Sequence, residues 1–468
     1  MDAEIAPSPA PAAEPAPAPN PAPAAEPAPS PTPDRPSVPP ASLRPGLTLG
    51  LLSVQHGLIH AQTAVLPLVL VAVMDDFGVG VAEVGLLIGV STLLAGLVQL
   101  GFAGLQRLVD RRTILGAGGI VFGAGMAALA AATSWLAFVA MTIVARLGGS
   151  PQHPVGNALI TEQRPEHERA GAIAVHISMG NLGTVAVPLV GAWLIAGAGW
   201  GAAVLVIGLP AIVVGALILV AVRESGRDRA AALAHGSTLD GFRALRHERD
   251  LGWLFLASTV AAAGRGIGVV SVFVPLYLAL VLDLDAGTVA LMYTLLLAGS
   301  VPGPIVAGRI ADRVGHRPVL VVTYLAGAAA LVGLVLAGGS IPLVWLAVGF
   351  VGAFVFEESS LLQALLADVA PPALRDVAFS AYFTAMFAIG AVWAAFLGAV
   401  VGVLGDTAGF QVVFGLMAAG YLAAIPPVLR IREPRGQSAA ARVAPAPAAG
   451  STPPAISPPA GTAGMDPS

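Results

Sequence analysis

The sequence predicts an all-α integral membrane protein with twelve transmembrane helices in two pseudo-symmetric six-helix halves. Of its 468 residues, 56% are hydrophobic and only 11% are charged, whereas soluble domains carry about 25% charged residues. Twelve apolar runs are each close to the roughly 20 residues that a helix needs to cross the hydrocarbon core. Arginines gather in every second segment between these runs. A chain with so little charge is expected to face the lipid bilayer over most of its surface.

Short polar or Gly/Pro-rich turns separate the predicted spans. In chain order the spans cover residues 48–74, 83–105, 113–133, 135–160, 169–196, 200–222, 251–281, 287–308, 318–337, 341–367, 374–402 and 408–430. The segments after spans 2, 4, 6, 8 and 10 carry arginines such as Arg112 and Arg317, and the opposite loops carry Asp76, Asp285 and Asp406 but no arginine. Because arginine-rich loops stay in the cytoplasm, both termini and the long central loop are expected there.

The chain divides into five segments. These are a disordered Pro/Ala-rich tail over 1–46, a six-helix half over 47–222, a central loop over 223–250, a second half over 251–430 and a disordered tail over 431–468. The halves echo each other, since Pro165 and Arg169 match Pro371 and Arg375 at a spacing of 206 residues. Two parallel repeats with a site between them are a known plan for transporters.

A short run between spans 8 and 9 carries a specific motif. It reads Gly308-Arg-Ile-Ala-Asp312-Arg313-Val-Gly315-His-Arg317 and resembles the cytoplasmic-loop signature of the major facilitator superfamily. The resemblance implies twelve helices, transport activity and a cytoplasmic latch in which Asp312 meets the positive N-terminus of a helix. The corresponding turn after span 2 ends at Arg112 and carries its carboxylate, Asp110, at a shifted position.

A narrower resemblance covers spans 4 and 5. The runs Gly148-Gly-Ser-Pro-Gln-His153-Pro and Gly180-Asn181-Leu-Gly183, followed by Pro188 and Gly191, resemble the fosmidomycin-resistance branch of drug exporters. The sequence departs from that branch at Val155 and near Ile59-His60. Small residues allow close helix contact and proline bends a helix, so this stretch is also expected to pack tightly.

Ionisable residues at bilayer depth are costly and usually functional. Arg146 lies near the middle of span 4, Arg265 near the middle of span 7, and His153 lies further toward the cytoplasm. Arg146 is expected to face a cavity, with a structural pairing to backbone carbonyls as the alternative. Arg265 is expected at the same cavity, where it either balances the charge of the glutamates of span 10 or holds an anionic substrate. His153 is equally well interpreted as a proton-exchanging group and as a hydrogen-bonded packing residue.

Glu357 and Glu358 are adjacent in the apolar run of span 10. Neighbouring residues on a helix point about 100° apart, so one glutamate is expected to face the cavity and take up the coupled proton, and the other to face a helix contact. A structural ion pair is the alternative.

Two histidines of span 1, His56 and His60, lie four residues apart, with Gln62 nearby. This spacing can bind a metal, but no acidic or further histidine ligand lies on the same helix. His60 and Gln62 are therefore expected to line the cavity, and no metal site is expected.

The sequence favours a proton-coupled exporter of small drug-like or anionic molecules. The alternative is a proton-coupled importer of a small organic acid or another metabolite. An enzyme is not expected, because the chain has no cysteine, no phosphate-binding Gly-x4-Gly-Lys-Ser/Thr loop and no soluble catalytic domain. We expect no cofactor and no nucleic-acid partner. The Ala- and Gly-rich, lysine-free composition is typical of GC-rich bacteria, and we expect a monomer in the bacterial plasma (inner) membrane.

Overall fold

The computed structural model describes residues 43–433, apart from 107, 225–242, 244 and 372–373. The chain divides into one unit over Met1–Ser37 and another over Val38–Ser468, and every described residue belongs to the second. The two predicted tails and most of the predicted central loop lie outside the described residues.

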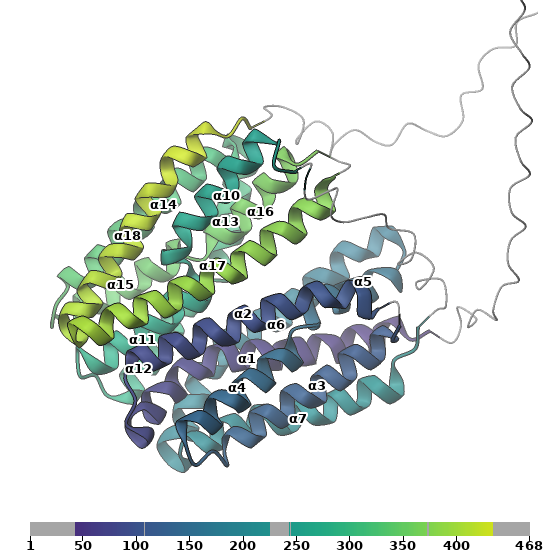
Figure 1. Ribbon diagram of the computed structural model, residues 1–468, viewed down its shortest axis with the longest axis horizontal. Coiled ribbons are helices and arrows are strands. Elements are labelled where there is room, and N and C mark those ends of the chain that lie inside the picture. Colours follow the sequence, from purple (N-terminus) through teal and green to yellow (C-terminus); the bar gives the residue numbers. More distant parts are fainter. Residues whose placement is uncertain (1–42, 107, 225–242, 244, 372–373, 434–468) are drawn as a thin grey trace, which may run out of the picture. The chain divides into compact units, whose positions relative to one another are not determined.

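The described part of the chain is helical throughout (Figure 1). Its first helices are α1 (Pro45–Phe77), α2 (Val81–Leu105), α3 (Arg111–Leu129), α4 (Trp135–Gly149), η2 (Gln152–Gly156), α5 (Asn157–Glu162), α6 (Glu166–Ala198) and α7 (Trp200–Ala221). After the central segment come α10 (Arg249–Ala261), η3 (Ala262–Gly264), η4 (Gly266–Val270), α11 (Ser271–Leu280), α12 (Ala286–Ala298), α13 (Pro302–Val314), α14 (His316–Leu336), α15 (Ile341–Phe354), α16 (Glu357–Val369), α17 (Arg375–Leu404) and α18 (Asp406–Arg430).

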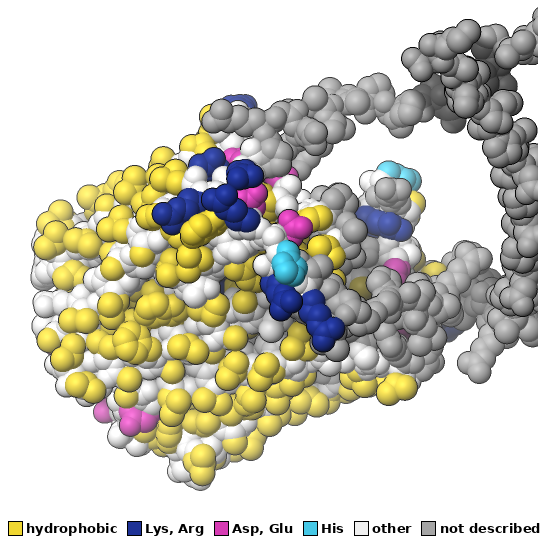
Figure 2. Space-filling view, turned by 45° about the horizontal axis from the view of Figure 1, so that its top comes forward, with side chains coloured by type: hydrophobic (Ala, Val, Ile, Leu, Met, Phe, Trp, Pro, Cys, Tyr) yellow, Lys and Arg dark blue, Asp and Glu magenta, His cyan; other side chains and the backbone are white. Residues whose placement is uncertain are grey.

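The described helices match a membrane protein, although they give fewer than twelve candidate spans. Ten helical stretches, counting α12 with α13 and α15 with α16, are long and apolar enough to cross a membrane, and the count reaches eleven when α10 to α11, bent by 41°, is taken as one span. The predicted span 135–160 is divided among α4, η2 and α5, and α4 has only 15 residues. Apolar side chains cover most of the face in Figure 2, and arginines gather at one end of it. Exposed Trp193, Val220 and Val403 are therefore suited to lipid.

Breaks in several of the predicted spans shape the middle of the bundle. Span 4 breaks at the π-helical turn η2, which Pro151 precedes and which contains Pro154, because proline lacks the N–H that the helix ladder needs. Span 7 breaks at Gly268, where φ is +89°, and span 10 breaks between α15 and α16. The Tyr421 hydroxyl on α18 donates to the carbonyl of Gly264 and also approaches that of Val355, at 3.4 Å. This one side chain therefore caps backbone groups that two of the breaks expose.

Close packing joins neighbouring and distant helices. α3 packs against α7, α1 against α6, and α14 against α18, while α2 runs along α17 and α12 packs on α6. The predicted packing glycines lie in the α1–α6 contact: a Cβ at Gly183 would lie 2.1 Å from the Gly57 carbonyl oxygen, and one at Gly191 would lie 2.5 Å from Val65. Pro188 is buried within α6, and Asn181 is half-buried. These contacts hold α6 beside α1 at the height of the site.

Candidate functional site

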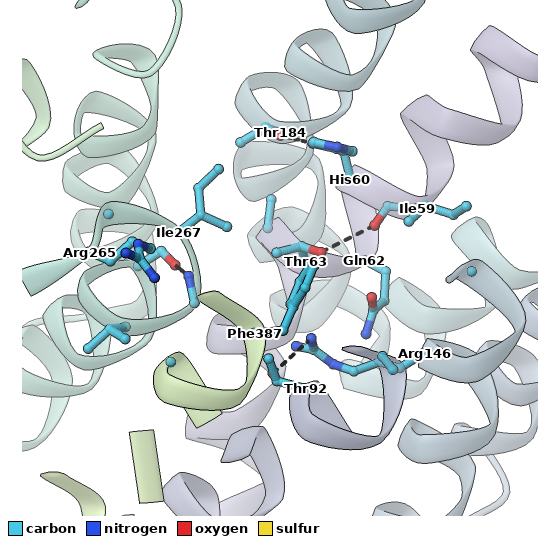
Figure 3. A pocket seen from close by; sticks show the side chains of 18 of the residues that line it. Ile59, His60, Gln62, Thr63, Thr92, Arg146, Thr184, Arg265, Ile267 and Phe387 are labelled. Carbon is cyan, nitrogen blue, oxygen red and sulfur yellow. Dashed lines mark hydrogen bonds between the residues drawn. The ribbon is translucent and has the colours of Figure 1, made fainter. Parts of the chain in front are cut away.

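A cavity of about 380 Å³ lies among helices from both the first and the second half of the chain. The interrupted helices supply much of its wall, including Ser150 and His153 from the α4–η2 break and Val355 and Phe356 from the α15–α16 break. The predicted residues that line it are His60, Gln62, Arg146, His153 and Arg265. Figure 3 shows Arg146 and Arg265 on opposite sides of this space, with Phe387 between them. Most of the remaining lining is apolar or uncharged, so the two arginines dominate its electrostatics.

Arg146 is held loosely by α2. Its Nη1 donates to Thr92 Oγ1 at 3.4 Å (Figure 3), and its buried Nε has no hydrogen-bond partner among the described residues. No carboxylate within the described ranges forms an ion pair with Arg146. A guanidinium carries five N–H donors, and hydrogen bonds from it to carboxylate or phosphate are among the strongest in proteins. Arg146 is therefore suited to bind an anionic group in the cavity.

Arg265 is tied to a buried partner. Its Nη2 lies 3.2 Å from Glu358 Oε1 and its Nε lies 3.3 Å from Glu358 Oε2, so the contact is bidentate. The same guanidinium donates to the backbone oxygen and the hydroxyl of Ser258 at 3.2 and 3.1 Å. Glu358 is 0% exposed and Arg265 is 7% exposed. The pair fixes α16 against the broken span that contains Arg265.

The structure places both glutamates of span 10 in helix contacts, and the proposal that one of them takes up the coupled proton stays a prediction. Neither Glu357 nor Glu358 is among the lining residues. Glu358 points toward Arg265, and Glu357 points toward α13, where a Cβ at Gly303 would lie 2.1 Å from Glu357 Oε1. Glu357 is 3% exposed, and no ion pair to it occurs among the described residues. It directly follows the lining residue Phe356 in the chain, so it lies one residue from the cavity wall.

Four histidines meet beside the cavity, and only three of them had been singled out from the sequence pattern. His56 and His60 of α1 meet His153 of η2 and His176 of α6, with the ring centroid of His56 within 4.9 Å of the other three. His176 is 0% exposed. The sequence signal for it was present, since an ionisable residue in an apolar run is unusual.

The cytoplasmic-loop signature is built around a helix start. Gly315 has a φ of +95°, a conformation that glycine adopts readily, and it precedes α14. Glu433 accepts hydrogen bonds from the backbone N–H groups of His316 and Arg317 at 2.5 and 3.2 Å, and the Arg317 guanidinium donates to the Leu429 carbonyl. The side chains of Asp312 and Arg313 are exposed at the end of α13, which also contains Gly308.

An equivalent arrangement lies at the start of α3. Glu224 accepts hydrogen bonds from the backbone N–H groups of Arg111 and Arg112 at 3.2 and 2.5 Å, and Asp110 occupies the position just before the helix. Burial raises the pKa of the Glu224 carboxyl, and the two backbone hydrogen bonds lower it in part. Glu224 and Glu433 therefore accept backbone hydrogen bonds at these helix N-termini, a role that the sequence pattern did not indicate.

Comparison with known proteins identifies the family. The family model described as Major Facilitator Superfamily matches residues 52–395. The chain belongs to the Major Facilitator Superfamily. The resemblance seen in the loop signature is thereby confirmed at the level of the superfamily, and the fold is that of a multi-pass membrane transporter.

One similar protein is named as a niacin transporter. The niacin transporter NiaP of Acinetobacter baylyi (strain ATCC 33305 / BD413 / ADP1) is 28% identical over 157 residues, which cover 34% of this chain and 36% of the relative. The match thus spans about a third of that relative's length. The narrower resemblance to the fosmidomycin-resistance branch is not confirmed by this match.

Solved structures share the fold at low sequence identity. A D-xylose-proton symporter has a TM-score of 0.68 and 18% identity, covering 83% of this chain and 99% of the symporter. A bacterial homolog of the human lysosomal transporter Spinster, in an inward-facing and unoccupied conformation, has a TM-score of 0.67 and 16% identity, covering 82% and 95%. The nucleoside transporter NupG has a TM-score of 0.66 and 13% identity, covering 83% and 100%.

Proposed function

We propose that the chain is a proton-coupled secondary transporter of small organic anions that works by alternating access. The observation that carries the proposal is Arg146, a guanidinium on the cavity wall without an ion-pair partner among the described residues. Arg265 on the opposite wall has its charge balanced by Glu358. An anion that enters the cavity would complete the charge balance of Arg146.

The proposed topology is twelve spans in two six-helix halves, with both termini in the cytoplasm of a bacterial inner membrane. It is supported by the paired breaks in spans 4 and 10, and by the matching carboxylates Glu224 and Glu433 at the starts of α3 and α14. We take α4, η2 and α5 together as one of these spans.

The proposed orientation predicts the location of fused reporters. Fusions after Arg112, Arg243 and Arg317 should report cytoplasm, and fusions near Asp76, Asp285 and Asp406 should report the outside, because arginines anchor their loops in the cytoplasm. Paired alkaline phosphatase and green fluorescent protein fusions measure this. A periplasmic signal after Arg243 would contradict the proposed topology.

For the direction of transport we propose export, supported by the resemblance of the α4–α6 stretch to drug exporters. Import of a small organic acid is the second candidate, favoured by the match to a niacin transporter. The two directions differ in which imposed gradient drives accumulation. An antiporter fills vesicles that are acidic inside, and a symporter fills vesicles that are acidic outside.

The function is tested with purified full-length protein in liposomes. Radiolabelled nicotinate and the phosphonate fosmidomycin serve as anionic probes, with D-xylose and a nucleoside as uncharged probes, under pH gradients of both polarities. We expect an anion to accumulate with one polarity. Arg146→Gln should reduce its accumulation by about tenfold or more, because a hydrogen bond to a charged group is worth about 1.5–3 kcal/mol.

Two controls make this assay specific. Empty liposomes give the passive distribution of a weak acid. Arg246→Gln makes the same substitution at an exposed arginine outside the cavity and should leave accumulation unchanged. Gradient-driven uptake of an uncharged probe without any response to the anions would overturn the proposed substrate class.

A further inference from the structure

The four histidines beside the cavity have no role in the proposed binding of an anion by Arg146. Its rings come from three elements: His56 and His60 from α1, His153 from η2 and His176 from α6. The His56 ring stacks on that of His176 at a centroid distance of 4.2 Å, and it meets those of His60 and His153 edge-on at 4.5 and 4.9 Å. No carboxylate hydrogen-bonds to these rings within the described residues, so the cluster is a set of imidazoles alone.

Hydrogen bonds determine which nitrogen of His56 carries the proton. Its Nδ1 lies 2.8 Å from the carbonyl oxygen of His176. A carbonyl oxygen only accepts, so Nδ1 must carry the hydrogen and donate it. The lone pair is then on Nε2, which is buried and has no hydrogen-bond partner among the described residues.

The same reasoning applies to His60. Its Nδ1 lies 3.1 Å from Thr184 Oγ1 (Figure 3), and the Thr184 hydroxyl donates its hydrogen to the Gly180 carbonyl at 3.1 Å. Thr184 therefore accepts from His60 Nδ1–H, which leaves the Nε2 lone pair of His60 available. Histidines that bind metals typically donate their other ring N–H to an oxygen in this way, because that bond fixes the ring orientation and the tautomer.

The spacing of three of these imidazoles suits a metal ion. One ring nitrogen each of His56, His60 and His153 lie within 4.8 Å of one another. Around a tetrahedral ion with Zn–N bonds of about 2.0–2.1 Å, ligand nitrogens lie roughly 3.3 Å apart, so modest side-chain rotation closes the site. His60 and His153 line the cavity, which leaves the fourth position open to water or to a solute.

We propose that His56, His60 and His153 bind a divalent transition-metal ion, with Zn²⁺ as the reference ion, in a three-imidazole site open to the cavity. Imidazole ligands suit Zn²⁺, Cu²⁺ and Ni²⁺, whereas Mg²⁺ and Ca²⁺ prefer oxygen. His176 is a positioning residue, because its carbonyl and its stacked ring hold His56. Gly180 allows this arrangement, since a Cβ there would lie 2.8 Å from the His56 ring.

The test uses full-length protein carrying an affinity tag without histidine. A second group, His316, Asp368 and Glu433, also brings possible metal ligands together, so every protein in the test carries His316→Asn. Zn²⁺ is titrated by calorimetry. Co²⁺ is followed by its visible absorption, because four-coordinate Co²⁺ absorbs visible light more strongly than the six-coordinate aqueous ion. We expect one ion per chain and a Co²⁺ band that Zn²⁺ abolishes.

Variants assign the ion to the cluster. His60→Ala and His153→Ala should abolish the Co²⁺ band. Thr184→Val, which removes only the acceptor for His60 Nδ1–H, should weaken Zn²⁺ binding by about 10- to 100-fold. His167→Ala is the matched control, because the His167 side chain is 81% exposed on α6 and its loss should change nothing.

Two results would overturn the metal site. One is the absence of stoichiometric Zn²⁺ binding and of a Co²⁺ band in the parent protein, which would leave the cluster as neutral, hydrogen-bonded imidazoles. The other is unchanged binding in both His60→Ala and His153→Ala, with melting temperatures near that of the parent. Neither readout depends on transport, so the metal site and the proposed function fail independently.

Discussion

Glu358→Gln is expected to destabilise the protein strongly, because it leaves Arg265 charged and buried without its partner. Removing one member of a buried ion pair costs about 3–5 kcal/mol. Arg265→Gln should have a similar effect by leaving Glu358 alone. The double variant Arg265→Gln/Glu358→Gln should recover most of the lost stability, since neither residue then carries a charge, and its transport should stay impaired. Thermal unfolding in detergent, followed by size-exclusion chromatography, measures all three.

An exposed pair provides the control for this cycle. Arg164 and Glu168 are 3.2 Å apart, and the Glu168 side chain is 50% exposed. Exposed pairs contribute about 0–1 kcal/mol, so Glu168→Gln should leave the melting temperature almost unchanged. If both single variants at 265 and 358 behave like Glu168→Gln, the buried pair does not stabilise the folded protein.

Glu357→Gln is expected to separate substrate movement from proton movement. Glu357 is buried without an ion-pair partner among the described residues, so the amide should fit its site with little loss of stability. The amide cannot release a proton, and a group that couples transport must bind a proton in one conformation and release it in another. We expect substrate exchange across the membrane to stay within about twofold, and gradient-driven accumulation to fall about tenfold or more.

The measurement compares two transport modes of the same vesicles. Counterflow of labelled substrate against unlabelled substrate reports exchange, and uptake under a pH gradient reports coupling. Glu168→Gln serves again as the control because it changes an exposed carboxylate. Full gradient-driven accumulation by Glu357→Gln would exclude Glu357 as the coupling group, and His153 would be the next candidate.

Helix positions could be predicted from the sequence because lipid requires long apolar runs. The predicted span 200–222 coincides with α7 (Trp200–Ala221), and 318–337 with α14 (His316–Leu336). The break in span 4 also had a local signal in Pro151 and Pro154. The break between α15 and α16 had no such signal, because the side chain that meets the Val355 carbonyl there is Tyr421 from the distant helix α18.

The candidate site was predicted only in part, because contacts between distant residues decide it. Arg146 and His60 were expected to face the cavity, and His153 was expected either to exchange protons or to pack; all three are among the residues that line the cavity. The direction of Glu358 depends on Arg265, 93 residues away in the chain, so helical periodicity could not determine it. The histidine cluster likewise needs α1, η2 and α6 to meet, and spacing on one helix revealed only His56 and His60.

The central claim is that proton movement and anion movement are coupled through this cavity. Its most direct test is the pH inside sealed vesicles, reported by a trapped dye, after an anion gradient is imposed without any initial pH gradient. The account predicts a pH change that Arg146→Gln reduces to the level of empty liposomes and that Glu357→Gln abolishes while labelled anion still exchanges. Movement of labelled anion through the unaltered protein without any accompanying pH change would contradict the account.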